Sequence, residues 1–436
     1  MGGVVRAKRS LLKRFFGILG PGLVTGAADD DPSGIATYAQ AGAAFSYGML
    51  WTVPVTLPLM MGVQEICDRT ALATGDSLGT LARRRFDRQP RIVIGILTVA
   101  LLGANTMSSA ADLMAVGQGM QMLGAGPDQL WTALAGIGIT VALVAGRFSV
   151  MAKIFKWLCL TLLAYVCVLF VSDIDWRDVL AGLLGLDFRF SLDYLGFIVA
   201  VLGTTISPYL FFWQSAHRVE ELREENDDGD DAVSLEARPV SSANNKLRAA
   251  RADVFIGMFF SVLVMFSIIA ATAATVGKHG GQISSAADAA RALEPIVGPA
   301  AKFLFAAGFV GSGVLGVPVL AGSASAGLAG LWGKQWGIDR SVRRAPVFYT
   351  LLGVATLGGV LITFFVEDPI QLLILSAIVN GVAAAPFLIV TMLISGDRKI
   401  MGEYRNGKLA AALGWGTTAI MVVTGCTGIW VAIAGS

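Results

Sequence analysis

Three consecutive aspartates, Asp29 to Asp31, stand in an otherwise apolar stretch near the start of the chain and run directly into Pro-Ser-Gly at 32–34. A carboxylate at the centre of a membrane helix costs about 2.5–3.5 kcal/mol on insertion scales. Proline removes a backbone donor, and a nearby glycine lets the chain leave helical geometry. We therefore predict a broken helix in which Asp31 offers an anionic oxygen beside free carbonyls, a combination that suits a hard divalent cation.

A second interruption, Gly-Thr-Thr-Ile-Ser-Pro at 203–208, lies inside another apolar run in the middle of the chain. Taken alone, each interruption has a plainer interpretation: the aspartates could form a loop outside the membrane, and Pro208 could only kink a continuous helix. Taken together they favour a site, because one broken helix in each half is the sequence signature of midplane binding in inverted-repeat transporters.

Composition indicates what kind of protein must hold these breaks. The 436 residues are 55% hydrophobic and 15% charged, whereas a soluble domain carries about 25% charge, and the mean hydropathy is +0.68. Apolar runs near the ~20-residue length of a membrane helix recur along the whole chain. These features exclude a soluble enzyme, a disordered scaffold and a nucleic-acid-binding protein, and they predict an all-α integral membrane protein.

We expect eleven spans in a two-repeat arrangement. Helices 1–5 fall within 19–172, helices 6–10 within 194–395 and helix 11 at 410–434, and the acidic connector at 216–248 is expected to be flexible and cytoplasmic. The alternate connectors and the basic segment 1–18 hold 28 of the 33 Lys and Arg residues. The positive-inside rule then predicts a multi-pass protein of the cytoplasmic membrane with its N-terminus inside and its C-terminus outside.

The sequence resembles the NRAMP family of divalent metal transporters over about residues 17–395. Three stretches carry the resemblance, and they are similar to the family's first-, second- and sixth-helix motifs: Gly-Pro-Gly at 20–22 with Asp-Pro-Ser-Gly at 31–34, Gln-Glu-Ile-Cys-Asp-Arg at 64–69, and Ser-Pro-Tyr-Leu at 207–210 with Gln-Ser at 214–215. The resemblance implies a LeuT-like inverted-repeat bundle whose helices 1 and 6 are broken.

The resemblance also implies a set of site residues. Asp31 matches the family's metal-binding aspartate, the carbonyls of Ala28 and Thr204 fall where the family uses backbone oxygens, and Asn380 lies near a polar ligand position.

Several family positions carry a different residue in this chain. Ser33 and Gly34 replace a glycine and an asparagine, and Ser207 stands where the family has its metal-binding methionine. A thioether selects soft or borderline metals, so its loss should relax discrimination against magnesium. This pattern resembles the divergent NRAMP-related magnesium transporters.

Proton coupling is expected to be weak or absent. Asp112 matches an acidic residue of the family's proton route, but Tyr209 and Gln214 replace both sixth-helix histidines. Histidine is the side chain that usually titrates near neutral pH. Asp112 could instead be a polar residue satisfied by Asn105 or Ser108.

Two further acidic groups are given roles from their positions. Asp30, like Asp29, is expected to form an outer electrostatic funnel, and Glu65 and Asp68 are expected to pair with Arg69 or neighbouring arginines.

The leading hypothesis is a secondary transporter of Mg²⁺ or Mn²⁺ that is not an enzyme, works by alternating access and needs no cofactor. The metal is its substrate, the lipid bilayer surrounds it, and no nucleic acid or obligate protein partner is expected. The alternatives are a proton-coupled importer of Mn²⁺ or Fe²⁺, a transporter of an organic solute, a membrane-embedded metal-dependent enzyme, and a sensor.

Overall fold

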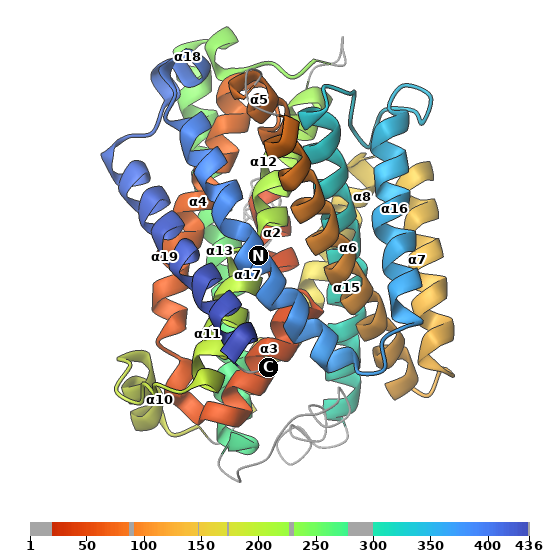
Figure 1. The fold of residues 1–436 in the computed structure, drawn as a ribbon, viewed down its shortest axis with the longest axis vertical. Coiled ribbons are helices and arrows are strands. Elements are labelled where there is room, and N and C mark those ends of the chain that lie inside the picture. The colour runs from red at the N-terminus through yellow and green to blue at the C-terminus, as the bar shows by residue number, and fades with distance from the viewer. Residues whose placement is uncertain are drawn as a thin grey trace, which may run out of the picture.

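The computed structural model describes residues 20–86, 91–146, 148–171, 174–225, 231–277 and 300–434. Within these ranges the chain is a bundle of helices with no strand (Figure 1). The predicted N-terminal segment 1–18 lies outside the described residues. The helices and short 3-10 turns are α2 (Pro21–Asp29), α3 (Pro32–Phe45), η1 (Ser46–Met49), α4 (Thr52–Thr74), α5 (Leu78–Arg85), α6 (Arg91–Met122), α7 (Asp128–Ala145), α8 (Phe148–Leu158), η2 (Cys159–Leu162), α9 (Leu163–Val171), α10 (Trp176–Leu183), α11 (Leu192–Thr205), α12 (Pro208–Glu224), η3 (Leu235–Ala237), α13 (Val240–Thr275), α15 (Ala300–Leu331), α16 (Pro346–Thr363), α17 (Pro369–Ser395), α18 (Arg398–Met401), η5 (Gly402–Tyr404) and α19 (Lys408–Ala434).

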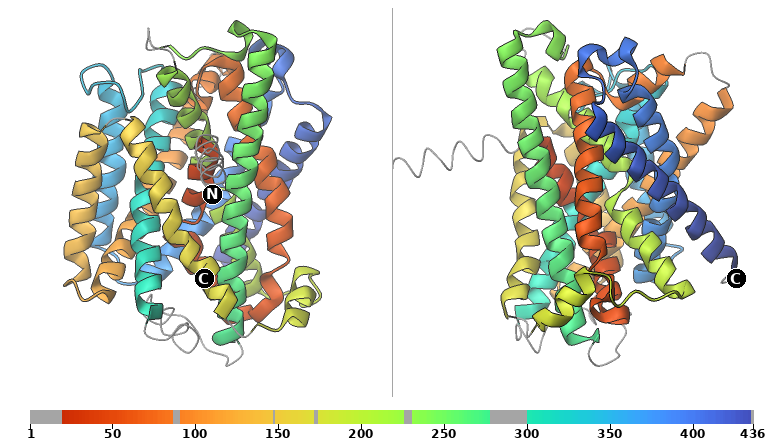
Figure 2. Two further views of the ribbon diagram at one scale, coloured as in Figure 1. Left: turned by 180° about the vertical axis from the view of Figure 1, so that it is seen from behind. Right: turned by 90° about the vertical axis from the view of Figure 1, so that its left-hand side faces the viewer.

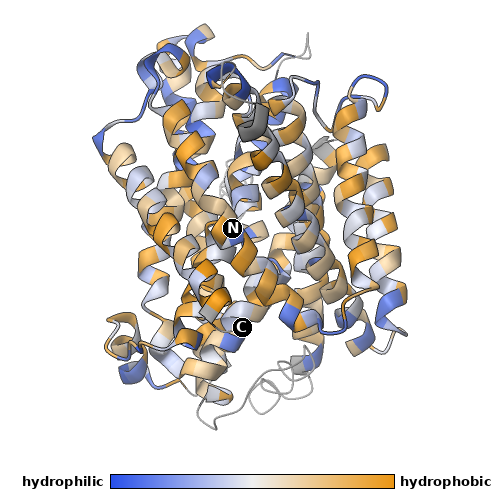
Figure 3. Cartoon of the chain, viewed as in Figure 1, coloured by the Kyte–Doolittle hydropathy of each residue, from blue (hydrophilic) through white to orange (hydrophobic). Residues whose placement is uncertain are grey.

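Most of these helices have the length and composition of membrane spans. In the described part of the chain nine helices are long and apolar enough to cross a bilayer, or ten if α3–η1 and α4, bent by 110°, count as one span. Every one of the eleven predicted segments falls on helix. Fewer spans than predicted are found because α2 and α3 are individually short and α4 is long enough but passes the test only together with α3–η1. Hydrophobic residues fill the middle of the bundle and hydrophilic ones gather at its two ends (Figure 3).

The predicted flexible connector at 216–248 is wrong at its two ends, which are helical, and its acidic middle at 226–230 lies outside the described residues. Helix α12 continues to Glu224 and α13 already begins at Val240, so helix covers most of this stretch. Cationic groups among the acidic residues explain the difference: Arg238 contacts Glu225 at 3.0 Å, and Lys246 contacts Glu221 at 3.2 Å and also Glu225.

The two broken helices form the centre of the bundle. Residues of α2 and α12 are almost entirely buried, and α4, α6, α13, α15 and α17 surround them, while α7, α16 and α19 lie outside (Figures 1 and 2). Glycines allow the closest approach, because a Cβ on Gly22 would lie 2.6 Å from the Asp253 backbone of α13. Small residues at such contacts are how membrane helices pack closely without a hydrophobic driving force.

Connectors at the two ends of the bundle follow the predicted alternation. The arginine-bearing α5 and α18 lie at one end, and α10 lies at the other (Figure 1). We call the end that carries α5 and α18 the basic end.

Candidate functional site

The two helix breaks have the same backbone geometry. In the first break Asp30 has φ −88° and ψ 48° and Asp31 is extended at φ −66° and ψ 170°; Pro32 then begins α3. In the second break Ile206 has φ −114° and ψ 57° and Ser207 is extended at φ −87° and ψ 143°; Pro208 then begins α12. Proline suits the first position of a helix because its missing N–H would have no partner there. Both predicted breaks are therefore confirmed, and each leaves carbonyls at the helix end without a backbone N–H partner from the same helix.

Asp31 lies at the junction of α2 and α3 and is 1% exposed. Its Oδ1 accepts hydrogen bonds from the Ser33 hydroxyl at 2.6 Å and the Gly34 backbone N–H at 2.9 Å. These bonds make Asp31 the N-cap of α3 and fix the orientation of its carboxylate. Its second oxygen, Oδ2, is left to face the neighbouring helix.

The Tyr209 hydroxyl joins two of the predicted metal ligands. It donates to the Ala28 carbonyl oxygen at 2.9 Å and lies 3.3 Å from Asp31 Oδ2. Tyr209 sits in the first turn of α12, so this contact links the break in α2–α3 to the break in α11–α12. An anionic oxygen and a free carbonyl oxygen thus converge on one buried point, which the phenol oxygen fills in this conformation.

Ser33 and Gly34 also bring the two breaks together. The Ser33 and Thr204 hydroxyls are 3.4 Å apart, and a Cβ on Gly34 would lie 3.2 Å from the Thr204 hydroxyl. The Ser207 hydroxyl points back along α11, because it bonds to the carbonyls of Gly203 at 2.6 Å and Thr204 at 2.9 Å. Ser207 and the Thr204 carbonyl therefore lie at the break, but in this conformation they are hydrogen-bonded to each other.

Asp29 and Asp30 do not form an outer funnel in this conformation. Both are 0% exposed, because α2 is enclosed on all sides. The Ser261 hydroxyl of α13 donates to Asp29 Oδ2 at 2.6 Å and lies 3.5 Å from Asp30 Oδ1. The other oxygen of each carboxylate has no hydrogen-bond partner among the described residues.

Asp112, on α6, is also buried without a partner. Neither of its carboxylate oxygens is hydrogen-bonded in the described part of the chain. The two expected partners bond elsewhere: Asn105 donates to the Leu320 carbonyl and Ser323, and Ser108 accepts from Asn380. The alternative interpretation, in which Asn105 or Ser108 satisfies Asp112, is therefore not supported.

Asp112 lies close to Asp31 across a glycine of α15. A Cβ on Gly316 would stand 2.5 Å from Asp112 Oδ2 and 3.3 Å from the Asp31 Cβ. A larger residue at this position would separate the two acids.

Asn380 and Gln214 contact other groups than Asp31. The Asn380 amide donates to Ser108 at 2.9 Å, and its own oxygen has no partner within the described ranges. The helix carrying it approaches the second break closely, since a Cβ on Gly203 would lie 2.7 Å from the backbone nitrogen of Gly381. Gln214 lies deeper along α12, where it accepts from Thr25 and donates to Asp68 at 2.9 Å.

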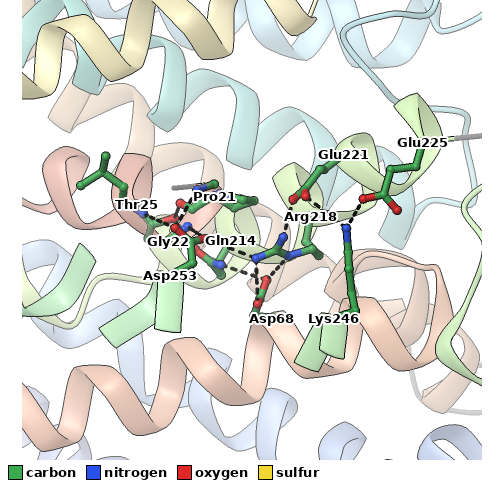
Figure 4. Close-up of polar contacts among 12 residues, drawn as sticks. Pro21, Gly22, Thr25, Asp68, Gln214, Arg218, Glu221, Glu225, Lys246 and Asp253 are labelled. Atoms are coloured by element: carbon green, nitrogen blue, oxygen red, sulfur yellow. Dashed lines mark hydrogen bonds and ion pairs between the residues drawn. The ribbon is translucent and has the colours of Figure 1, made fainter. Parts of the chain in front are cut away.

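Gln214 belongs to a second buried group, the ion-pair cluster of Asp68, Gln214, Arg218 and Asp253 (Figure 4). Arg218 contacts both oxygens of Asp68, at 2.7 and 3.0 Å, and reaches Asp253 at 3.3 Å. Asp253 in turn accepts from the backbone N–H groups of Gly20 at 2.7 Å and Gly22 at 2.8 Å. This carboxylate therefore caps the start of α2, where the helix dipole favours negative charge.

The partner of Asp68 differs from the prediction. Glu65 pairs with Arg69 at 3.0 Å as expected, whereas Asp68 pairs with Arg218 from α12. The sequence analysis missed Asp253, Ser261 and Gly316. No motif near Ser261 or Gly316 in the chain indicates that they lie beside the aspartates. The buried acid of Asp253, inside the apolar stretch of α13, was the one available signal.

The side chains that hydrogen-bond to Asp31 among the described residues are the hydroxyls of Ser33 and Tyr209. No described group of three or more His, Cys, Asp or Glu residues is arranged to hold a metal ion, so the four acids do not converge on one point. Asp31 offers one carboxylate beside carbonyl and hydroxyl oxygens, which is the donor set that hard cations prefer. Among the described residues no lysine, arginine or histidine forms an ion pair with Asp29, Asp30, Asp31 or Asp112.

Comparison with solved structures shows the fold. A mutant of the Eremococcus coleocola manganese transporter superposes with a TM-score of 0.74 at 17% identity, over 95% of this chain and 86% of that chain. A nucleobase-cation-symport-1 family transporter in a closed conformation gives a TM-score of 0.55 at 16% identity, over 95% and 93% of the two chains. The predicted all-helical, LeuT-like bundle is confirmed.

Sequence relatives have similar lengths. The divalent metal cation transporter MntH of Aeromonas hydrophila is 27% identical over 421 residues, which is 93% of each chain. The divalent metal cation transporter MntH 1 of Pseudomonas aeruginosa is 28% identical over 437 residues, covering 94% of this chain and 90% of the relative. These proteins are transporters, which confirms the expectation that the chain is not an enzyme.

The natural resistance-associated macrophage protein-like model, Nramp, matches residues 22–431. This match includes both helix breaks and nearly every described helix, and the chain therefore belongs to the Nramp family of multi-pass membrane transporters.

Proposed function

We propose that the protein moves divalent metal cations, Mn²⁺ and Mg²⁺, across the cytoplasmic membrane by alternating access. The convergence of the Ala28 carbonyl and Asp31 Oδ2 on the Tyr209 hydroxyl carries the proposal. It directs two oxygen ligands of the right chemistry at one buried point, from 2.9 and 3.3 Å. The relatives named as divalent metal cation transporters support the same substrate class.

A cation at this point explains why acids are buried here without basic partners. An isolated ionised carboxylate is very costly to bury, so it is either protonated or neutralised by a counter-charge. The carbonyl ends of α2 and α11 add the negative end of each helix dipole to the same region. In our proposal the ion contacts Asp31 and the Ala28 carbonyl first, and Tyr209 turns aside to admit it.

The remaining ligands come from the second break and its neighbours. We assign the Thr204 carbonyl, Ser207, Ser33, the backbone at Gly34 and the Asn380 side-chain oxygen to the ion or to its waters, because their small polar groups border the break. Magnesium keeps several waters in its shell. A site built from small hydroxyl groups and lacking a thioether suits such a hydrated ion.

The proposed transport is secondary and weakly coupled to protons. Tyr209 and Gln214 hold two of the positions where coupling histidines would stand, and both are engaged in hydrogen bonds to neutral or acidic partners. Proton-coupled import of Mn²⁺ or Fe²⁺ is the second candidate. The two unpartnered oxygens of Asp112, close to Asp31 across Gly316, favour it.

We assign the basic end of the bundle to the cytoplasm, with the N-terminus inside and the C-terminus outside. The excess of lysine and arginine in the connectors at this end supports the assignment. We also assign Asp30, which is buried next to Asp31, to the ion pathway. Labelling of single cysteines in α5 and α10 from either side of intact cells tests the orientation.

Uptake into proteoliposomes tests the site. Asp31→Ala should abolish uptake of Mn²⁺ and Mg²⁺, while size-exclusion profile and thermal stability stay close to wild type. Asp193→Ala, an exposed acid on α11, is the matched control and should transport normally. Uptake by Asp31→Ala at the wild-type rate would remove the proposed site, and internal acidification that tracks metal entry would favour the proton-coupled candidate.

A further inference from the structure

A cleft of about 640 Å³ opens between α4, α13 and α19 at the basic end of the bundle. It lies away from the helix breaks and shares no residue with the ion-pair cluster. Its floor is α4, and α19 closes one side where a Cβ on Gly62 would lie 2.8 Å from the Leu413 side chain. None of the groups described above as candidate metal ligands lines it.

The cleft has an apolar wall and a charged rim. Met61, Val254, Phe255, Leu409 and Leu413 form the wall, and Phe255 and Leu409 are 47% and 74% exposed. These side chains belong to the membrane-spanning helices α4, α13 and α19, so the wall continues into the surface that faces lipid. Anything that occupies the cleft must therefore have an apolar part that tolerates the bilayer.

Positive charge dominates the rim. Arg69, Arg251, Arg405 and Lys408 line the cleft with only two acids, Glu65 and Glu403. Glu65 is shared, because it accepts from both Arg69 and Arg251 at 3.0 Å. Arg69 is also held by the Tyr404 carbonyl at 2.5 Å and by Asn406 at 2.9 Å.

Two rim cations remain without a counter-charge. Arg405 and Lys408 are exposed, and neither forms an ion pair in the part of the chain that the structure describes. Arg405 lies in the turn between η5 and α19, and Lys408 is the first residue of α19, so both stand beside the apolar wall. An Arg guanidinium offers paired N–H donors that match phosphate oxygens.

We propose that this cleft binds an anionic phospholipid. The headgroup phosphate contacts Arg251, Arg405 and Lys408, and an acyl chain lies along Met61, Phe255 and Leu413. Basic pockets between membrane helices at the cytoplasmic surface are the chemistry that holds such headgroups. The bound lipid would fill the wedge between α13 and α19 and hold α19 against α4.

Lipid retention measured by native mass spectrometry tests this proposal. The wild-type protein, purified from nanodiscs of phosphatidylcholine and phosphatidylglycerol, should keep one phosphatidylglycerol in preference to phosphatidylcholine. The double variant Arg405→Gln/Lys408→Gln should bind it roughly thirtyfold more weakly, from about fivefold for each basic residue near a membrane surface. The matched control is Arg398→Gln/Lys399→Gln, which removes the same two residue types from exposed positions on α18 and should bind like wild type.

A second variant separates lipid from free phosphate. Met61→Trp narrows the apolar wall but leaves the rim intact, so it should also lose the lipid, and inorganic phosphate alone should not stabilise the wild-type protein against heat. Equal loss of lipid in both double variants would overturn the proposal. So would equal retention of phosphatidylcholine, or stabilisation by inorganic phosphate that matches the lipid's.

Discussion

Two buried polar groups lie on neighbouring helices of this transporter and are built in opposite ways. In the ion-pair cluster, Arg218 holds Asp68 and Asp253, and Asp253 also accepts from the start of α2 (Figure 4). We call the second set, Asp29, Asp30, Asp31 and Asp112, the acid group. Among the described residues no cationic side chain forms an ion pair with any of its members, and four of its carboxylate oxygens have no hydrogen-bond partner. Both groups are almost fully shielded from solvent.

The difference fits a structural role for the ion-pair cluster and the functional role that we propose for the acid group. A buried charge is tolerated when it is paired and hydrogen-bonded, as in the ion-pair cluster, and removing one partner is then strongly destabilising. Charges left without a partner are retained where a mobile cation or proton completes them, and intramembrane acids of this kind mark ion pathways. A hydrogen bond from Thr25 to Gln214 connects the two groups through α2.

Breaking the ion-pair cluster should have the largest effect on folding. Arg218→Met leaves Asp68 and Asp253 buried without a counter-charge and should lower the free energy of unfolding by about 3–5 kcal/mol. Thermal unfolding in detergent, followed by intrinsic fluorescence, measures the change. A melting temperature equal to that of wild type would show that the cluster is not what holds α12 to α4 and α13.

A matched pair of acids sharpens the comparison. Asp253→Ala removes three charge-assisted hydrogen bonds at the start of α2 and the contact with Arg218, and it should cost at least about 1.5–3 kcal/mol. Asp112→Asn removes no hydrogen bond found in the described residues, so its thermal stability should equal or exceed that of wild type. Equal losses in the two variants would mean that both acids have structural partners.

The metal selectivity of transport tests whether Ser207, at the second break, contacts the ion. Ser207→Met introduces a thioether beside the proposed site and should raise uptake of Mn²⁺ or Cd²⁺ relative to Mg²⁺ on the order of tenfold, about 1.4 kcal/mol. Competition between the metals in proteoliposomes measures the ratio, and Ser207→Ala serves as the control for loss of the hydroxyl. An unchanged ratio in Ser207→Met would place residue 207 outside the ion's reach.

The smallest effect is expected at a solvent-exposed pair. Arg84 contacts Asp76 at 2.7 Å with 62% of its side chain exposed, and Arg84→Ala should change the free energy of unfolding by less than about 1 kcal/mol. The same thermal assay applies. A loss as large as that of Arg218→Met would contradict the view that burial, not pairing alone, distinguishes the ion-pair cluster.

Local chemistry made the helix breaks predictable from sequence. Pro32 and Pro208 each follow two residues in non-helical conformations, and proline restricts the backbone wherever it stands. Hydropathy likewise predicted the position of the spans, because the bilayer requires ~20 apolar residues whatever the helices pack against. The position of Asp31 at the first break followed from these two local rules.

Tertiary structure alone decided which buried charges have partners. Asp68 and Arg218 are 150 residues apart in the chain, and Ser261 and Asp29 are 232 apart. Such pairs form only when helices from different parts of the chain pack together. The sequence around Asp29–Asp31 therefore does not reveal which side chains face these acids. The same packing buries Asp29 and Asp30, which we predicted to face solvent. The hydropathy of the sequence indicates how deep a residue lies in the membrane, but the helices packed around it decide whether solvent reaches it.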